Sequence, residues 1–460
     1  MKLETLKEKK ILILGFAREG IESFNFLRKL FPKKEIGVGD IKEISNAILR
    51  GVSHSVRSSK FQISNLFKED KKARPHFGKD YLKAIQNYDI IIKTPGIAPK
   101  IIAPFVSKKQ RITSQTEIFF ENCPGKIVGI TGTKGKSTTA TLIHEVLKAG
   151  GIKTHLIGNI GKPALSYLVP ATKDDVYVYE LSSHQLFGLK HSPHIAVFLN
   201  IYSEHGDYYQ NLKEYVGAKS NIARWQTKKD YLIFNSKNKI VKKVAKYSKA
   251  QKVPLSSVNI KNIIRLSNIP LKGLFNVENV KAAIAVGNIF EIPRQKIRKA
   301  IKDFKGLPHR LEFVGIFQGI NFYNDSLATI PESTIAAIDT LDKNLQTIIL
   351  GGFDRGQGFE DLAKKILKSN IKNVILFPDT GKRIWKQISK IYTGPASTNG
   401  GLVRHFFVED MKEAVKHCYK YTKRGKICLL SPASASFNLF KNYAQRGDLF
   451  KKYVNKFAKK

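Results

Sequence analysis

The sequence is short of acidic residues and cysteines, and it has no long apolar run. Asp and Glu number 37 against 79 Lys and Arg, which gives a formal net charge of +42. The three cysteines show no metal-ligand spacing and cannot all pair, so we expect a reducing, cytoplasmic setting. No apolar run is long enough to span a bilayer, and we expect no membrane insertion. The charged N-terminus followed by the short run Ile11–Phe16 favours a buried first strand over a secretory signal.

The charge surplus raises the alternative of a nucleic-acid-dependent protein. The basic residues are dispersed along the chain, with only modest clusters at Lys68–Arg74 and in the C-terminal tail. We find no stripe of alternating aromatic and basic residues and no helicase-type motif. The sequence therefore predicts small-molecule substrates and no nucleic-acid partner. We also expect a monomer, although no sequence feature determines the oligomeric state.

Short β-branched runs alternate with longer amphipathic stretches, which is typical of parallel sheets joined by crossover helices. The expected strands are Ile11–Phe16, Asp89–Gly96, Lys126–Thr131, Asp175–Ser183, Ile195–Ile201, Thr347–Gly352, Asn373–Phe377 and Lys426–Pro432. They are apolar almost throughout, so we expect helices on both faces of each sheet.

A chain of 460 residues is too long for one core. Boundaries near Glu121–Lys126 and Lys305–Glu312 predict three α/β domains. These are a Rossmann-like domain (1–122), a central P-loop domain with a mostly parallel sheet (123–312) and a Rossmann-like C-terminal domain (313–460). The region 42–79 is rich in Ser and Lys with poor periodicity, and we expect an irregular insertion there.

The segment Gly125–Glu145 reads as a strand, a glycine-rich turn and a helix. Only two residues separate the loop glycines, whereas four separate them in the usual P-loop. Backbone N–H groups at such a helix start cradle phosphate, the loop lysine adds positive charge, and the next hydroxyl can reach Mg²⁺. The sequence therefore predicts a nucleoside triphosphate site made of Gly132, Thr133, Lys134, Gly135, Lys136, Ser137 and Thr138.

Other polar residues follow the expected strands. Glu180 ends the strand 175–183, where a P-loop enzyme holds its metal, although a strand-capping acid is an alternative. His205 follows the next strand, and Lys219 lies beyond it; neither is informative alone. The turn Gly15–Gly20, with Asp40 after a second strand, matches half of a Rossmann fingerprint.

Taken in order, these segments and several others form one pattern. They are GTKGKST, GNIG, ELSSHQL, LNIYSEHGD, AKSNIA, NVENVKAAIA, GLPHRLE, YNDSLAT, LGGFDRG and LSPASASFNLFKNYAQRG. The set resembles the Mur ligases of peptidoglycan synthesis, and among them the type that adds D-glutamate. The resemblance covers nearly the whole chain except 42–79, and the short loop spacing is a feature of that family. It implies an ATP-dependent ligase that joins glutamate to UDP-N-acetylmuramoyl-L-alanine through an acyl phosphate.

The resemblance also implies roles for individual residues. The catalytic residues are Lys136, Glu180, His205 and Lys219, the last carbamylated by CO₂. Two Mg²⁺ ions are held by Ser137, Glu180, His205 and Lys219. The further nucleotide contacts are Asn276 or Asn279, Arg310 and Asp325. The uridine-diphosphate substrate contacts Arg18, Glu19, Asp40, Thr94, Asn159 and Ser182. The glutamate contacts are Thr329, Arg355, Ser436, Phe437 and Tyr443.

Two residues depart from the pattern of the D-glutamate-adding type, because Arg355 and Leu327 stand where lysines are usual. A related ligase that adds L-glutamate also lacks the second lysine, so L-glutamate is the alternative acceptor. Another Mur-type or folylpolyglutamate-synthase-like ligase is a further alternative, which the segment Leu430–Gly447 disfavours. A catalytically inactive binding protein is disfavoured because the nucleotide and metal residues are all present.

Overall fold

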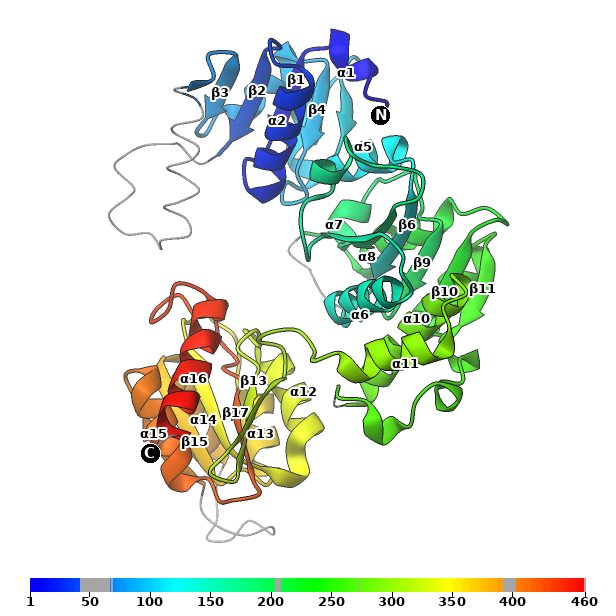
Figure 1. The fold of residues 1–460 in the computed structure, drawn as a ribbon. Coiled ribbons are helices and arrows are strands. Elements are labelled where there is room, and N and C mark those ends of the chain that lie inside the picture. Colours follow the sequence, from blue (N-terminus) through cyan, green and yellow to red (C-terminus); the bar gives the residue numbers. More distant parts are fainter. Residues whose placement is uncertain (42–66, 68, 203–207, 272, 392–402, 459–460) are drawn as a thin grey trace. The chain divides into compact units, whose positions relative to one another are not determined.

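The computed structural model describes residues 1–41, 67, 69–202, 208–271, 273–391 and 403–458 (Figure 1). His205 and most of the segment 42–79 lie outside these residues. Within the described part, contacts divide the chain into one compact unit that ends at Phe304 and another that begins at Lys305. The finer division at residues 122 and 312 stays a prediction.

The first unit contains two sheets in which every neighbouring pair of strands is parallel. The first sheet has the order β3–β2–β1–β4–β5, with β1 Ile11–Leu14, β2 Ile36–Asp40, β3 Ala73–Phe77, β4 Ile90–Lys93 and β5 Arg111–Thr113. The second has the order β11–β10–β9–β6–β8–β7, with β6 Lys126–Thr131, β7 Thr154–Gly158, β8 Val176–Glu180, β9 Ile195–Phe198, β10 Tyr231–Phe234 and β11 Gln251–Pro254. The expected parallel α/β architecture is thus confirmed for this unit.

Helices flank both sheets of the first unit (Figure 1). They are α1 Thr5–Glu8, α2 Arg18–Leu30, α4 Pro99–Ile102, α5 Gln115–Asn122, α6 Lys136–Ala149, α7 Ser183–Leu186, α8 Leu212–Arg224, α9 Lys239–Tyr247, α10 Leu274–Ile289 and α11 Arg294–Asp303. Strand β8 shows why both faces are covered, because Val176 and Val178 belong to one hydrophobic core and Tyr177 and Tyr179 to another.

The second unit is built on a single sheet. Its order is β12–β13–β17–β14–β15–β16, with β12 Glu312–Phe317, β13 Ile320–Asn324, β14 Leu345–Gly352, β15 Asn373–Asp379, β16 Arg404–Phe407 and β17 Ile427–Leu430. The pair β12–β13 is antiparallel and the other pairs are parallel. The helices are α12 Pro331–Leu341, α13 Glu360–Leu367, α14 Thr380–Ile391, α15 Met411–Tyr421 and α16 Tyr443–Ala458. Across the described residues of both units, no helix is long and apolar enough to span a membrane.

One expectation about the first unit is wrong for part of its range. Residues 42–79 were expected to be irregular, yet Ala73–Phe77 forms β3, which pairs in parallel with β2. This is an edge strand in which only Ala73 is buried, so it needs no continuous apolar run. It also tolerates Pro75, a residue that sheets accept mainly at their edges.

Candidate active site

The loop between β6 and α6 is the expected phosphate-binding turn. Gly135 caps α6 with a left-handed φ of 89°, and a Cβ there would lie 2.7 Å from Asn279 Oδ1. The loop is fixed at its other side, since Thr133 N and Lys134 N donate to the backbone and side-chain oxygens of Asn200, each at 2.8 Å. A glycine is therefore required at position 135, and the turn leads directly into a helix N-terminus that favours anions.

Two lysine ammonium groups converge on one carbonyl of this loop. Lys136 Nζ donates to Gly132 O and to Thr133 O, each at 2.9 Å. Lys219, a buried residue of α8, also donates from Nζ to Gly132 O at 2.9 Å, and its ammonium lies 5.0 Å from the centre of the Tyr215 ring. The structure thus places residues 136 and 219 together, although 83 positions separate them, and it concentrates positive charge at the turn.

Glu180 supplies a negative group beside this turn. Strands β6 and β8 are neighbours, with Ile130 opposite Glu180. The Glu180 side chain is buried, and among the described residues its Oε2 has no hydrogen-bond partner. A buried carboxylate oxygen without a partner is costly, and such an oxygen is a preferred ligand of Mg²⁺. Glu180 therefore fits a metal, and Ser137, the other residue expected at that metal, lies in the first turn of α6.

His205, which is expected to bind the second metal, lies outside the described residues. In the part of the chain that the structure describes, no group of three or more His, Cys, Asp and Glu side chains is arranged to hold a metal. The fit to a metal thus rests on Glu180 alone.

The two candidate asparagines lie next to the phosphate loop. Thr139 Oγ1 donates to Asn279 Oδ1 at 3.0 Å, and Asn279 Nδ2 donates to Asn276 Oδ1 at 2.9 Å. Both asparagines are buried and lie on α10. They fix the start of α6 against α10 and border the space beside Gly135.

Four of the six expected contacts of the uridine-diphosphate substrate lie along one seam between the two sheets of the first unit. Arg18, at the start of α2, donates to Gly161 O, and Glu19 Oε1 accepts from Gln185 Nε2 at 2.7 Å. Gln185 in turn closes a capping box with Ser182 at the start of α7. Asn159 N donates to Glu180 O at 3.3 Å, which ties the GNIG segment to the end of β8. Burial raises the pKa of Glu19, an effect that Gln185 partly offsets.

The other two expected contacts, Asp40 and Thr94, belong to the first sheet. Asp40 Oδ2 accepts from Phe16 N at 2.7 Å and so orders the turn after β1, while Thr94 N donates to Leu14 O at 2.9 Å. Sequence reasoning missed Lys93, whose Nζ donates to Ile97 O at 2.8 Å and to Thr94 O at 3.1 Å. Burial lowers the pKa of Lys93 to about 8. A lysine at the last position of an otherwise apolar strand is the signal that could have identified it.

Asp325 follows β13 in the second unit. Its Oδ1 accepts from Leu311 N at 3.0 Å and its Oδ2 from Ser431 Oγ at 2.8 Å. Burial nevertheless raises the pKa of Asp325 to about 7, outweighing these bonds and the positive charge of Arg310. Arg310 therefore lies close enough to Asp325 for its positive charge to lower the pKa of that carboxyl.

The raised pKa of Asp325 predicts a pH dependence of stability. From about pH 4 to 7 the folded state keeps a proton that the unfolded state has released, so stability falls as pH rises through that window. Asp325→Asn should remove this loss, which is at most roughly 4 kcal/mol. We would follow urea unfolding by Trp385 fluorescence in a Trp225→Phe background, which leaves one tryptophan, at pH 5 and pH 8. A difference between the two proteins that stays constant with pH would contradict the raised pKa.

The expected glutamate contacts follow the carboxyl ends of three neighbouring strands, β13 (Thr329), β14 (Arg355) and β17 (Ser436 and Phe437), and Tyr443 is the first residue of α16. The Arg355 guanidinium lies 5.4 Å from the centre of the Phe437 ring, and Phe437 is 57% exposed. Ser436 is buried, Tyr443 is 41% exposed, and Thr329 is half-buried. An exposed aromatic beside an arginine suits a ligand with both a carboxylate and an apolar stem.

Sequence reasoning also missed Arg446. This fully buried side chain donates to the carbonyls of Ser326, Ser434 and Ala435 at 2.9, 3.1 and 3.3 Å. Burial lowers the pKa of Arg446 to about 9. Arg446 thereby joins the segment before Thr329 to the segment before Ser436. It was missed because it lies in the C-terminal motif of a chain with many basic residues, where a single arginine does not stand out.

Comparison with known proteins identifies the family. Residues 130–263 match the Mur ligase middle domain, and residues 309–434 match the Mur ligase glutamate ligase domain. The chain is 36% identical to the UDP-N-acetylmuramoylalanine–D-glutamate ligase of Acetivibrio thermocellus, over 82% of this chain and 85% of that one. It is 33% identical to the protein of the same name from Clostridium tetani, over 94% of this chain and 99% of that one.

Solved structures show the same fold at lower identity. The UDP-N-acetylmuramate–alanine ligase of Thermotoga maritima has a TM-score of 0.56 and 17% identity, and the alignment covers 98% of this chain and 100% of that one. The MurF ligase of Thermotoga maritima, solved in complex with ADP, has a TM-score of 0.56 and 14% identity, with 86% and 92% coverage. The chain therefore belongs to the Mur ligase family of ATP-dependent ligases.

Proposed function

We propose that this enzyme joins D-glutamate to UDP-N-acetylmuramoyl-L-alanine at the expense of ATP, in the synthesis of peptidoglycan precursors. The observation that carries the proposal is the convergence of Lys136 and Lys219 on Gly132 O, beside the buried and unpartnered Glu180 Oε2. The substrate assignment is supported by relatives of that name at 33–36% identity over most of the chain.

The chemical problem is to bring a carboxylate to a triphosphate, because the two repel each other. In the proposed reaction a carboxylate oxygen attacks the γ-phosphorus and ADP leaves, which gives an acyl phosphate. The amine nitrogen of glutamate then attacks the acyl carbon, loses a proton and expels phosphate. The N–H groups at the start of α6 and the Lys136 ammonium would hold the phosphates during the first step.

Mg²⁺ and a lysine carbamate belong to the same proposal. Ser137 and Glu180 would hold one Mg²⁺, and His205 with carbamylated Lys219 would hold a second. Bound Mg²⁺ would neutralise charge on the transferring phosphoryl group. Carbamylation turns the Lys219 amine into a carboxylate-like ligand, which suits its position beside the phosphate loop.

We assign the remaining residues by the family pattern. Asn276, Asn279, Arg310 and Asp325 would contact the nucleotide, and the seam residues of the first unit would contact the uridine diphosphate. Thr329, Arg355, Ser436, Phe437 and Tyr443 would bind glutamate, with the Arg355 fork holding the side-chain carboxylate. The proposed organisation is a three-domain monomer, divided at residues 122 and 312, that acts in the cytoplasm on small molecules.

The second candidate function is the same ligation with L-glutamate, which Leu327 favours because it stands where lysine is usual in the D-glutamate-adding type. The test uses purified protein, Mg-ATP and UDP-N-acetylmuramoyl-L-alanine with each glutamate enantiomer separately. Phosphate release and product mass are measured. Product with D-glutamate alone supports the main proposal, product with L-glutamate alone supports the second, and ATP binding without either product contradicts both.

A further inference from the structure

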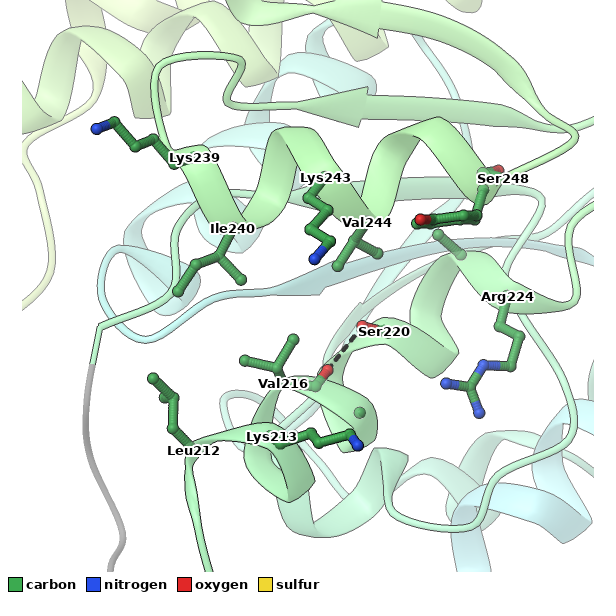
Figure 2. Close-up of a pocket in the computed structure, with 13 residues that line it drawn as sticks. Leu212, Lys213, Val216, Ser220, Arg224, Lys239, Ile240, Lys243, Val244 and Ser248 are labelled. Atoms are coloured by element: carbon green, nitrogen blue, oxygen red, sulfur yellow. Dashed lines mark hydrogen bonds between the residues drawn. The ribbon is translucent and has the colours of Figure 1, made fainter.

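Helices α8 and α9 enclose a groove that has no part in the proposed reaction (Figure 2). Its volume is about 820 Å³, which lies within the range of small-molecule sites. The floor is apolar and is formed by Val216 of α8 together with Ile240 and Val244 of α9, all half-buried. The groove can therefore receive an apolar chain or ring.

Basic side chains border this apolar floor. Lys213, Arg224 and Lys243 line the groove, and Figure 2 shows Lys243 extending from α9 toward α8, whereas Lys213 and Arg224 lie along α8. No acidic residue is among the lining residues, and among the described residues none of these three cations is in an ion pair. Glu214, the acidic residue of α8, turns back to accept from Gln210 N at 2.7 Å. The charge of the groove therefore complements an anion.

Gly217 of α8 widens the groove. It lies inside α8, where glycine is less favourable than alanine. A Cβ at this position would meet no atom within 4 Å, so packing against the described residues does not require a glycine. Since Gly217 lines the groove, the absence of a side chain enlarges the space there.

We propose that the groove binds a small amphiphilic anion, namely a single aliphatic chain that ends in a carboxylate. The apolar floor would bury the chain, and Lys213, Arg224 and Lys243 would hold the anionic end. The groove is bounded by two helices and open to solvent on its other side, and its volume is that of a small ligand, which favours a free molecule over an extended lipid surface or a partner's helix.

The groove is connected to the phosphate loop through α8. Val216 and Ser220 line it, and Lys219, between them in sequence, donates to Gly132 O on the loop. An occupant that shifts α8 thereby changes the position of Lys219. This coupling rests on the proposed role of the loop in nucleotide binding, whereas binding of the anion does not.

The test is titration of the full chain with decanoate by calorimetry. Two further probes are butyrate, which has the carboxylate but only a short chain, and decanol, which has the long chain but no charge. We expect decanoate to bind with Kd on the order of 10 µM and the two probes at least tenfold more weakly. Gly217→Phe, which fills the groove, should abolish binding while leaving thermal unfolding intact. Arg224→Gln with Lys243→Gln should weaken binding at least tenfold, and the matched Lys242→Gln should leave it unchanged.

Several results would overturn the proposal. These are no decanoate binding, equal binding by Gly217→Phe, or binding of an acidic amphipathic peptide but not of decanoate. The coupling is tested by the Kd of ADP in saturating decanoate, which should shift at least threefold in the wild type and not in Gly217→Phe. An unchanged Kd would overturn the coupling alone. The ligase assay with the two glutamates is independent of all these measurements.

Discussion

Lys136→Ala is expected to lower the rate of ATP-dependent amide formation by at least about a thousandfold. Lys136 Nζ lies against the phosphate turn, where it donates to Gly132 O and Thr133 O, and alanine removes both the charge and these two bonds. The phosphates would then meet the helix N-terminus without the Lys136 charge. The measurement is ADP formation in the presence of both carboxylate and amine substrates, together with the Kd of ATP by calorimetry.

Lys148→Ala is the matched control for this prediction. Lys148 lies in the last turn of α6, outside the expected phosphate turn, and its side chain is exposed. We expect the control to retain activity within about threefold, because surface charges contribute little. Comparable losses in the two variants would show that the effect is not specific to the Lys136 ammonium, and full activity of Lys136→Ala would contradict the assigned site.

Lys219→Ala is expected to lower the ligation rate by at least about a hundredfold, and short carboxylates should restore part of it. The substitution removes a buried side chain whose Nζ donates to Gly132 O, and it leaves a space beside the phosphate loop. Formate, acetate or propionate can enter that space and supply the oxygens that a carbamate would supply. The measurement is the ligation rate of the variant as a function of added carboxylate, with chloride at equal ionic strength as the reference.

Two comparisons make this result specific to a carbamate. Lys219→Arg keeps a cation but cannot be carbamylated, so we expect it to be inactive and not rescued. Lys228→Ala, an exposed lysine beyond the end of α8, should behave as the wild type. A fully active Lys219→Ala enzyme, or one that formate and chloride stimulate equally, would contradict the carbamate.

The sequence predicted the middle of each sheet better than its edges. Strands such as Lys126–Thr131 are covered on both faces, and their apolar runs are visible in the sequence. The edge strands β3, β5, β7, β11, β12 and β16 are only partly buried and need no continuous apolar run, and none of them was among the expected strands. The inner strands β10 and β13 were also missing from the expected strands, although they are largely buried. An apolar run is therefore most informative where both faces of a strand pack against helices.

In the candidate site, the residues of one continuous motif were predicted better than contacts between residues that are far apart in the sequence. The phosphate loop is a continuous motif, and its glycines could be interpreted from spacing and from the helix that follows. Lys219 pairs with Gly132, and Glu19 pairs with Gln185. Only the topology brings these residues together, and no local pattern in the sequence indicated either hydrogen bond. Arg446 was hidden by the abundance of basic residues, because its role depends on complete burial.

The carbamate proposed for Lys219 would make the enzyme responsive to dissolved CO₂, at a lysine that shares the carbonyl of Gly132 with Lys136. A carbamate nitrogen keeps one hydrogen, so Lys219 can still donate to Gly132 O after CO₂ has added to it. The charge at this position then changes sign while the hydrogen bond persists. The phosphate loop would alternate between a form with two cations and a form with a cation and an anion, and the ratio of the two would follow the CO₂ tension of the cell.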